Sequence, residues 1–205
     1  MRELFPEPAA DVDPVERYQG DERSFGPGGP ARPWVLVNMI ATADGATAVQ
    51  GRSGGLGGAA DKRVFAAIRS VPDVILVGAG TVRAESYGPP STPPNRPAPP
   101  RLAIVTRSLD LDLTRPLFTA AAPDARPMVV TTEQQRDPGR LAEVEAVAEV
   151  VVAGDTDVDV NRALSALGDR GARVVLCEGG PSLNGQLVAV GAVDELCMTL
   201  APLVA

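Results

Sequence analysis

Short runs of β-branched and aliphatic residues alternate along this chain with segments of helical period, and this alternation limits the possible folds more than any other feature. The runs occupy residues 34–41, 74–77, 102–105, 128–130, 150–152, 174–177 and 196–200. Apolar residues at helical spacing mark two segments between them, 61–70 and 158–168. Repeated strand and helix units form a mostly parallel sheet with helices on both faces. We therefore expect a three-layer α/β/α domain whose ligand site lies at the carboxyl ends of the strands.

The alternation extends over residues 33–205, which predicts one domain of ordinary size. Residues 1–32 are rich in proline and glycine and have no sustained period, so we interpret them as an N-terminal arm. A second proline-rich stretch, 88–100, can form neither a helix nor a strand ladder. It predicts an exposed, extended loop.

The composition excludes several classes of function. The chain has no histidine, which excludes Ser-His-Asp and Cys-His catalysis and histidine-ligated zinc, and we expect no metal site. A net charge of −7 and few aromatic residues argue against a nucleic-acid partner. Neither a signal-peptide core nor an apolar run of membrane-spanning length is present, so we expect a cytoplasmic protein without membrane contact. Cys177 and Cys197 lie in apolar contexts without a CxxC spacing, which predicts buried, reduced thiols.

The strongest local signal for a ligand site is the turn after the sixth apolar run. Gly179 and Gly180 are followed by Pro181, a residue typical of the first position of a helix. Paired glycines let backbone amides approach a phosphate, and the free N–H groups of the next helix favour one. An ordinary strand-to-helix turn capped by Gly180 and Ser182 explains the pattern equally well. Glu178 favours the ligand site, because a carboxylate that ends a buried strand must be paired or serve a ligand.

The second apolar run, 74–77, also leads into small residues. Gly78, Gly80 and Thr81 follow it, but Arg83 occupies the third glycine position of a GxGxxG motif. A standard Rossmann turn is therefore a weak interpretation. Thr81 is either a ligand contact or a helix cap, and the pattern alone favours the cap.

Thr106, Arg107 and Ser108 follow the third run. A guanidinium between two hydroxyl groups suits a phosphate monoester such as the 2′-phosphate of NADPH. A solvated arginine gives the same pattern.

Two further features lie near the first run. Asp44 precedes Gly45 in a pair that predicts a turn, and residues 51–58 form a glycine-dense loop that is either simply flexible or a mobile lid. Arg69 lies late in the helix that follows the loop. It either reaches a ligand or pairs with the C-terminus of that helix.

Four segments in this order resemble the pyrimidine reductases of riboflavin biosynthesis: NMIATADG at 38–45, IRSVPDVILVGAGTVRAE at 68–85, EGGPSLNG at 178–185 and VDELCMTLAPL at 193–203. The resemblance implies a dihydrofolate reductase-like fold with a mostly parallel mixed sheet. It also implies hydride transfer from NADPH to the ribosyl C1 of a phosphoribosylamino-pyrimidine, a small-molecule partner, and a homodimer.

The resemblance assigns roles to individual residues, and it reverses the preference for Thr81 as a cap. It implies that Glu178 is the candidate catalytic residue, with water as the alternative proton donor. The candidate substrate-binding residues are Asp44, Ser53, Arg69 and Glu178. The candidate cofactor-binding residues include the three that follow the third run. The full set is Thr81, Glu85, Thr106, Arg107, Ser108, Gly179, Gly180, Pro181, Ser182, Leu183 and Asn184.

The chain departs from the family pattern at several positions, among them Asn38 and Gly55, and two departures bear on the substrate phosphate and on the sheet edge. Where members have A-D-N-P followed by a substrate-binding arginine, this chain has AESYG at 84–88. We consider Arg96, in the proline-rich loop, as the substitute. Members continue past A-P-x-L with a further antiparallel strand, so we expect this domain to lack its last strand, with an open sheet edge. Two alternatives stay open: an NADPH-dependent reductase of another heterocycle, such as dihydrofolate, and a catalytically silent nucleotide-binding module.

Overall fold

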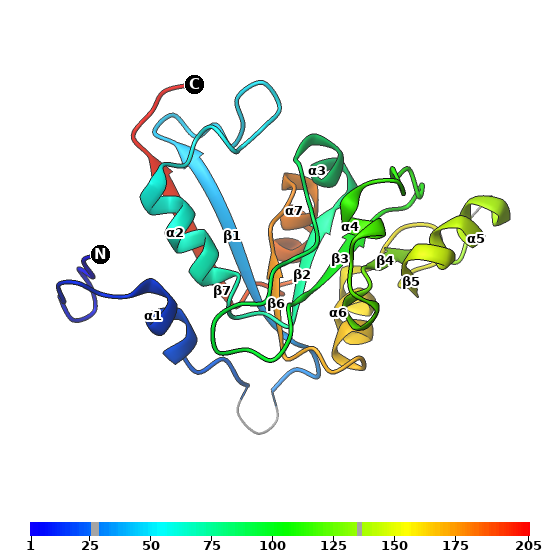
Figure 1. The fold of residues 1–205 in the computed structure, drawn as a ribbon, viewed down its shortest axis with the longest axis horizontal. Helices are drawn as coiled ribbons and strands as arrows, with labels where there is room; N and C mark the ends of the chain where they lie inside the picture. The colour runs from blue at the N-terminus through cyan, green and yellow to red at the C-terminus, as the bar shows by residue number, and fades with distance from the viewer. Residues whose placement is uncertain (26–28, 135–136) are drawn as a thin grey trace.

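The computed structural model describes residues 1–25, 29–134 and 137–205, and its centre is one parallel sheet (Figure 1). The order across the sheet is β5-β4-β3-β2-β6-β1-β7, and all the pairings between these strands are parallel. All seven apolar runs are confirmed as strands, and their carboxyl ends meet at one edge of the sheet. The strands are β1 (Trp34–Thr42), β2 (Val74–Gly78), β3 (Arg101–Val105), β4 (Met128–Thr131), β5 (Glu149–Val152), β6 (Val174–Cys177) and β7 (Glu195–Ala201).

Helices surround this sheet, and the two predicted helical segments correspond to α2 and α6. Asp137 and Asp159 cap α5 and α6, because each side chain accepts a hydrogen bond from a backbone N–H of the first turn. The helices are α1 (Pro14–Gly20), α2 (Ala59–Ile68), α3 (Ala79–Ala84), α4 (Pro116–Thr119), α5 (Pro138–Val147), α6 (Val160–Gly168) and α7 (Pro181–Ala189), with a 3-10 turn η1 at Pro123–Ala125.

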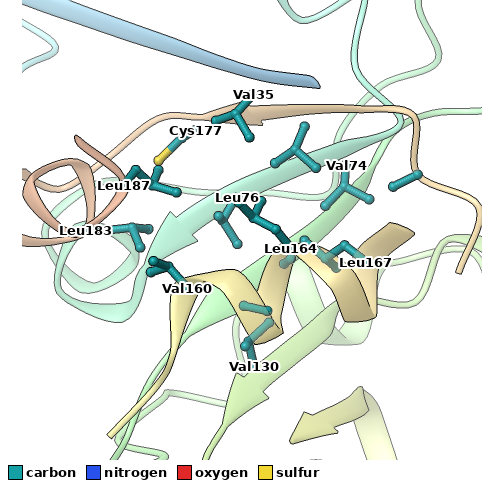
Figure 2. Packing of buried hydrophobic residues seen from close by; sticks show 14 of the residues in the cluster. Val35, Val74, Leu76, Val130, Val160, Leu164, Leu167, Cys177, Leu183 and Leu187 are labelled. Carbon is teal, nitrogen blue, oxygen red and sulfur yellow. The ribbon is translucent and has the colours of Figure 1, made fainter. Parts of the chain in front are cut away.

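Both faces of the sheet are covered, because alternate residues of each strand point to opposite sides. On one face, Val74 and Leu76 belong to the same buried cluster as Leu164 of α6 (Figure 2). On the other face, Ile75 and Val77 pack with residues of α2, α3, α4 and α5. The near-continuous apolar composition of the strands follows from this double burial, and the three-layer α/β/α prediction is confirmed.

The N-terminal arm contains a short helix that its sequence did not indicate, and it is attached to the edge of the sheet (Figure 1). Asp13 caps α1 by accepting a hydrogen bond from Val15 N. Arg23 donates to both carboxylate oxygens of Glu195 on β7, at 2.7 and 2.9 Å. The side chain of Arg23 is only 3% exposed, so this ion pair fixes part of the arm against β7. Residues 26–28 of the arm lie outside the described residues.

The proline-rich stretch 88–100 forms neither helix nor strand, as predicted. Arg96 within it donates to Val71 O and Pro72 O and pairs with Asp73 at 2.8 Å. These partners precede β2, at the edge of the sheet opposite the carboxyl ends of the strands. The prediction that Arg96 replaces the missing substrate-binding arginine is therefore wrong, because its guanidinium is held at the far edge.

The described residues contain no helix long and apolar enough to cross a bilayer. Within the same parts of the chain, the acidic and cysteine side chains form no group of three that could hold a metal ion.

Candidate active site

A cavity of about 460 Å³ lies at the carboxyl edge of the sheet, beside β1, β2 and β6. Cavities of this size are typical of small-molecule sites, and α/β sheets place such sites at this edge. Four segments form the wall: β1, the loop between β1 and α2 with α2 itself, α3 with the residues after it, and the turn between β6 and α7. The lining residues include Met39, Ile40, Thr47, Ser53, Asp61, Lys62, Phe65, Thr81, Glu85, Tyr87, Glu178, Gly180 and Pro181.

Two glycine-containing turns pack directly against each other in this wall. The backbone N–H of Gly78 donates to Gly179 O at 2.7 Å. A Cβ on Gly180 would lie 2.9 Å from the hydroxyl oxygen of Thr81, and a Cβ on Gly78 would lie 3.5 Å from Gly180 N. Gly179 has a φ of 91°, a conformation that favours glycine. The contact with Thr81 therefore favours glycine at position 180, and the backbone conformation favours it at position 179, whereas a Cβ at Gly78 would make an ordinary van der Waals contact.

The starts of α3 and α7 show whether Thr81 and Ser182 act as helix caps. The N-cap residues of α3 and α7 are Gly78 and Gly180, and neither helix has a side-chain cap hydrogen bond. Thr81 lies inside α3 with its hydroxyl against Gly180 at the cavity wall. The cap interpretation is therefore wrong for Thr81 and Ser182, and it is confirmed for Gly180.

Glu178 forms a buried cluster with two residues from distant parts of the chain. Its side chain is only 3% exposed, and both of its oxygens accept hydrogen bonds from Arg69 at 2.6 Å. The hydroxyl of Tyr87 donates to Oε2 of Glu178 at 2.7 Å. A buried carboxylate needs such partners, since its burial alone is costly. Glu178 is therefore paired, which is one of the two expectations for it, and it also lines the cavity.

Arg69 and Tyr87 support one another as well as Glu178. The guanidinium of Arg69 lies over the ring of Phe65, 4.4 Å from its centroid, and 5.6 Å from the ring centroid of Tyr87. Burial acts against the charge of Arg69, but its hydrogen bonds to Glu178 hold its pKa above the usual value. Burial, together with the charge of Glu178, raises the pKa of Tyr87, so its hydroxyl stays a proton donor in this cluster. Arg69 therefore extends to Glu178 rather than to the C-terminus of its own helix.

Sequence reasoning named Glu178 and Arg69 but missed Tyr87. Tyr87 lies two residues after Glu85, within the segment that departs from the family pattern. The sequence feature that could have indicated a role for it is its position at the border of the proline-rich loop.

A second polar contact joins the glycine-dense loop to the end of α3. The backbone N–H and the hydroxyl of Ser53 both donate to Oε1 of Glu85, at 2.7 and 3.0 Å. Both residues line the cavity. The loop 51–58 is thus held at the cavity by a carboxylate, and Glu85 and Ser53, predicted to serve different ligands, meet in one contact.

The three residues after β3 lie outside the cavity lining. Thr106 is buried, and its hydroxyl accepts a hydrogen bond from Leu109 N at 3.1 Å. Ser108 accepts one from Asp110 N at 3.4 Å. Arg107 forms an exposed ion pair with Asp157 at 2.6 Å. Because β3 neighbours β2 in a parallel sheet, these residues still occupy the same edge as the cavity.

Other predicted residues also lie away from the cavity lining. Leu183 is buried in the core beneath α7. The amide of Asn184 donates to the sulfur of Met39 at 2.9 Å and accepts from the thiol of Cys177 at 3.2 Å. Asn184 therefore packs behind the glycine turn, where it contributes to holding Gly179 in place.

Asp44 lies in the turn after β1 and outside the cavity lining. The hydroxyl of Thr42 donates to its carboxylate at 2.6 Å, and the backbone N–H of Ala205 also reaches it, at 3.2 Å. These hydrogen bonds lower the pKa of Asp44. The predicted turn at Asp44 is present, and its carboxylate serves that turn.

Both cysteines are free thiols, as predicted. Burial raises the pKa of Cys177 to about 12, which makes its thiol unreactive at neutral pH. Cys197 is only half-buried, so the prediction of two buried thiols holds for Cys177 alone.

The parallel sheet, the helices on both of its faces and the cavity at its carboxyl edge define this chain as a three-layer α/β domain with a small-molecule site. The chain belongs to the RibD C-terminal domain family, whose model matches residues 33–205.

The relatives extend this assignment. The 2,5-diamino-6-ribosylamino-4(3H)-pyrimidinone 5′-phosphate reductase of Methanothermobacter thermautotrophicus is 33% identical over 173 residues, which cover 84% of this chain and 79% of that protein. A pyrimidine reductase-like protein from Corynebacterium diphtheriae has a TM-score of 0.80 at 28% identity, covering 95% of this chain and 83% of that one. RibD from Acinetobacter baumannii shares the fold, with a TM-score of 0.70 at 22% identity over 85% of this chain and 48% of that chain.

The contact between the two glycine turns yields a stability prediction. Gly180→Ala places a Cβ against the hydroxyl of Thr81, and such overpacking is expected to lower the free energy of unfolding by about 1–3 kcal/mol. Gly185→Ala is the matched control, because its Cβ would enter open space inside α7. It should stabilise the protein by up to about 1 kcal/mol through its higher helix propensity. Urea unfolding measures both, and a Gly180→Ala protein as stable as the parent would contradict this contact.

Proposed function

We propose that this protein is an NADPH-dependent reductase that transfers hydride to the ribosyl C1 of a phosphoribosylamino-pyrimidine in riboflavin biosynthesis. The observation that carries the proposal is the pair of glycine turns at the cavity wall, with Thr81 against Gly180. Membership of the RibD C-terminal domain family and the names of the relatives give the reaction its substrate class.

The residues present fit a dinucleotide. The backbone at Gly179 and Gly180 is free of Cβ atoms beside the cavity, and the first N–H groups of α7 have no side-chain cap. A diphosphate suits such a turn, because exposed backbone N–H groups at a helix N-terminus bind anions. The bound cofactor supplies the hydride, and Thr81 and Pro181 flank the place where it would lie.

Arg107 is suited to the 2′-phosphate that distinguishes NADPH from NADH. Its ion pair with Asp157 is exposed on both sides, at 70% and 73%. Exposed pairs of this kind contribute little free energy, so a phosphate dianion competes well for the guanidinium. Ser108 follows Arg107 and adds an exposed hydroxyl group to this part of the sheet edge, whereas the hydroxyl of Thr106 is buried and bonded to Leu109 N.

The substrate would occupy the space between β1, α2 and the Glu178 cluster. Ser53 and Glu85 offer polar contacts to a heterocycle there, and Phe65 offers an aromatic surface. Arg69 is bonded to Glu178 through both of its carboxylate oxygens. In this proposal Arg69 and Tyr87 position Glu178, which presents acceptor oxygens to the cavity.

The reaction joins a hydride to C1 of the ring-opened imine and a proton to its nitrogen, and the former ring oxygen becomes a hydroxyl group. The geometry favours water over Glu178 as the proton donor. Both oxygens of Glu178 accept hydrogen bonds, and three donor atoms already surround it. The contribution of the chain is therefore to hold the donor carbon and the acceptor carbon close together. Such proximity can lower the activation free energy by as much as about 7–11 kcal/mol.

The reductase assignment predicts that the full chain oxidises NADPH in the presence of the phosphoribosylamino-pyrimidine. Absorbance at the reduced nicotinamide band measures the rate, and dihydrofolate is assayed in parallel. Faster turnover of dihydrofolate would show that the proposed substrate is wrong, although the protein would still be an NADPH-dependent reductase. Tight NADPH binding without oxidation by either compound would indicate a silent nucleotide-binding module and refute the proposal.

Arg107→Ala is expected to raise the Kd for NADPH by about tenfold or more, since a charge-assisted contact to the 2′-phosphate contributes about 1.5–3 kcal/mol. The Kd for NADH should stay the same. Calorimetric titration with each nucleotide measures both values, and Arg83→Ala is the control because Arg83 is an exposed arginine paired with Asp110 outside the cavity lining. Equal losses for the two nucleotides would show that Arg107 does not recognise the 2′-phosphate.

We also propose that the protein forms a homodimer through β7. This strand lies at the edge of the sheet and exposes Leu196, Met198 and Leu200 on one side, at 58%, 50% and 73%. An apolar stripe of this kind is typical of an interaction surface.

Met198→Glu should convert the dimer to a monomer in sedimentation velocity experiments. Val152→Glu, at an exposed position on β5 at the opposite edge, should leave the dimer intact. A monomeric parent protein would exclude this surface as a contact between copies.

A further inference from the structure

The proposed substrate carries a phosphate, and the cavity must supply a positive charge for it. A phosphate monoester is a dianion at neutral pH, and it is repelled by carboxylates that lie nearby. Three acidic side chains line this cavity, Asp61, Glu85 and Glu178. The anionic end of a ligand must therefore lie where a cation outweighs them.

Three arginines that could supply this charge, Arg69, Arg96 and Arg115, have other partners. Arg69 donates to both oxygens of Glu178. Arg115 donates to the backbone oxygens of Val82 and Glu85, which ties it beneath α3. Arg96 lies at the opposite edge of the sheet, as described above. Moving any of these guanidinium groups to a ligand would leave polar partners without their hydrogen bonds.

Lys62 differs from these arginines. It is the lysine of α2 and lines the cavity together with Phe65, one turn further along the helix. Within residues 1–25, 29–134 and 137–205, no carboxylate lies within 4.0 Å of its ammonium group, although Asp61 is its immediate neighbour in the sequence.

Asp61 does not neutralise Lys62, because its carboxylate has other contacts. The hydroxyl of Thr199 on β7 donates to Oδ1 of Asp61 at 2.6 Å. The other oxygen, Oδ2, lies against the backbone of Gly57, where a Cβ could not be accommodated. Neighbouring residues of a helix point about 100° apart, so the two side chains leave α2 in different directions.

We infer that Lys62 binds the phosphate of the substrate and is the residue of this cavity that selects a phosphorylated ligand over its unphosphorylated counterpart. The inference rests on the proposed function and deepens it. It orients the ligand, with the phosphate at α2 and the remainder toward the polar contacts of Ser53 and Glu85 on the other wall. A single ammonium group suits this task, because lysine binds phosphate as a compact point charge on a flexible stem.

The test compares three single variants of the full chain: Lys62→Ala, Arg63→Ala and Arg52→Ala. Arg63 is the matched control, an exposed cation beside Lys62 on α2 that does not line the cavity. Arg52 is the rival, an exposed cation in the loop between the cavity-lining residues Gly51 and Ser53. Ribose 5-phosphate and ribose serve as binding probes in calorimetric titrations, and the KM is measured for the phosphorylated substrate and for the same compound after enzymatic dephosphorylation.

Lys62→Ala is expected to weaken ribose 5-phosphate binding and to raise the KM for the phosphorylated substrate by about tenfold to a hundredfold, the range of one charge-assisted hydrogen bond. Binding of ribose and the KM for the dephosphorylated compound should not change, nor should any value for Arg63→Ala. The inference is overturned if Lys62→Ala weakens both probes equally, if only Arg52→Ala weakens the phosphorylated one, or if the parent protein does not prefer ribose 5-phosphate to ribose.

The binding arm separates this inference from the proposed function. If the parent protein binds ribose 5-phosphate through Lys62 but reduces no pyrimidine, the reductase proposal fails and the phosphate site stands. If the pyrimidine is reduced with the same KM by the parent and by Lys62→Ala, the reductase proposal stands and the phosphate site fails.

Discussion

The hydrogen bond from Gly78 N to Gly179 O fixes the separation between two strand-to-helix turns, and the wall of the cavity depends on that separation. The turns belong to β2 and β6, which are neighbours at the centre of the sheet, so both helices that follow them start beside the cavity. A Cβ on Gly180 would lie too close to the hydroxyl of Thr81, and the positive φ of Gly179 favours glycine, which accounts for the glycine pair after β6. Behind the contact, Asn184 connects Met39 on β1 to Cys177 on β6, so that three central strands hold one turn in place.

Burial of Glu178 imposes a second constraint on the same edge. The residue lies between the end of β6 and the glycine pair, so its carboxylate is held at the start of the turn. Two donors come from separate segments to satisfy it, Arg69 from the end of α2 and Tyr87 from the start of the proline-rich loop. Removing one partner of a buried ion pair is far more costly than removing one of an exposed pair, about 3–5 kcal/mol against 0–1. The cluster therefore ties the end of α2 and the residues after α3 to the turn after β6, and it limits how far these parts of the cavity wall can move.

The sequence allowed the strands to be predicted well, because a strand buried on both faces must be apolar at almost every position, and Trp34 to Ala41 or Val74 to Val77 leave little choice. The glycine turn and Glu178 were also predictable, since local spacing carries their signal. Contacts between residues that are distant in the sequence could not be predicted in this way. Arg69 and Tyr87 stand 109 and 91 positions from Glu178, and no local pattern shows that they meet. Arg96 failed as a prediction for the same reason, because only the fold shows that its loop returns to the opposite edge of the sheet.

The proline-rich loop that follows Tyr87 has a consequence for folding. Each proline ring restricts the backbone before folding as well as after it, so the unfolded chain loses less conformational entropy when this segment becomes ordered. A loop of this length can thus be held with few tertiary contacts, such as the hydrogen bond from Gln19 to Pro94 O and the anchor at Arg96. Because the proline-rich loop is already restricted in the unfolded chain, Tyr87 is held in position at a small cost in conformational entropy. A glycine-rich loop of equal length would lose more entropy on folding and would need more favourable contacts to hold Tyr87 in the same place.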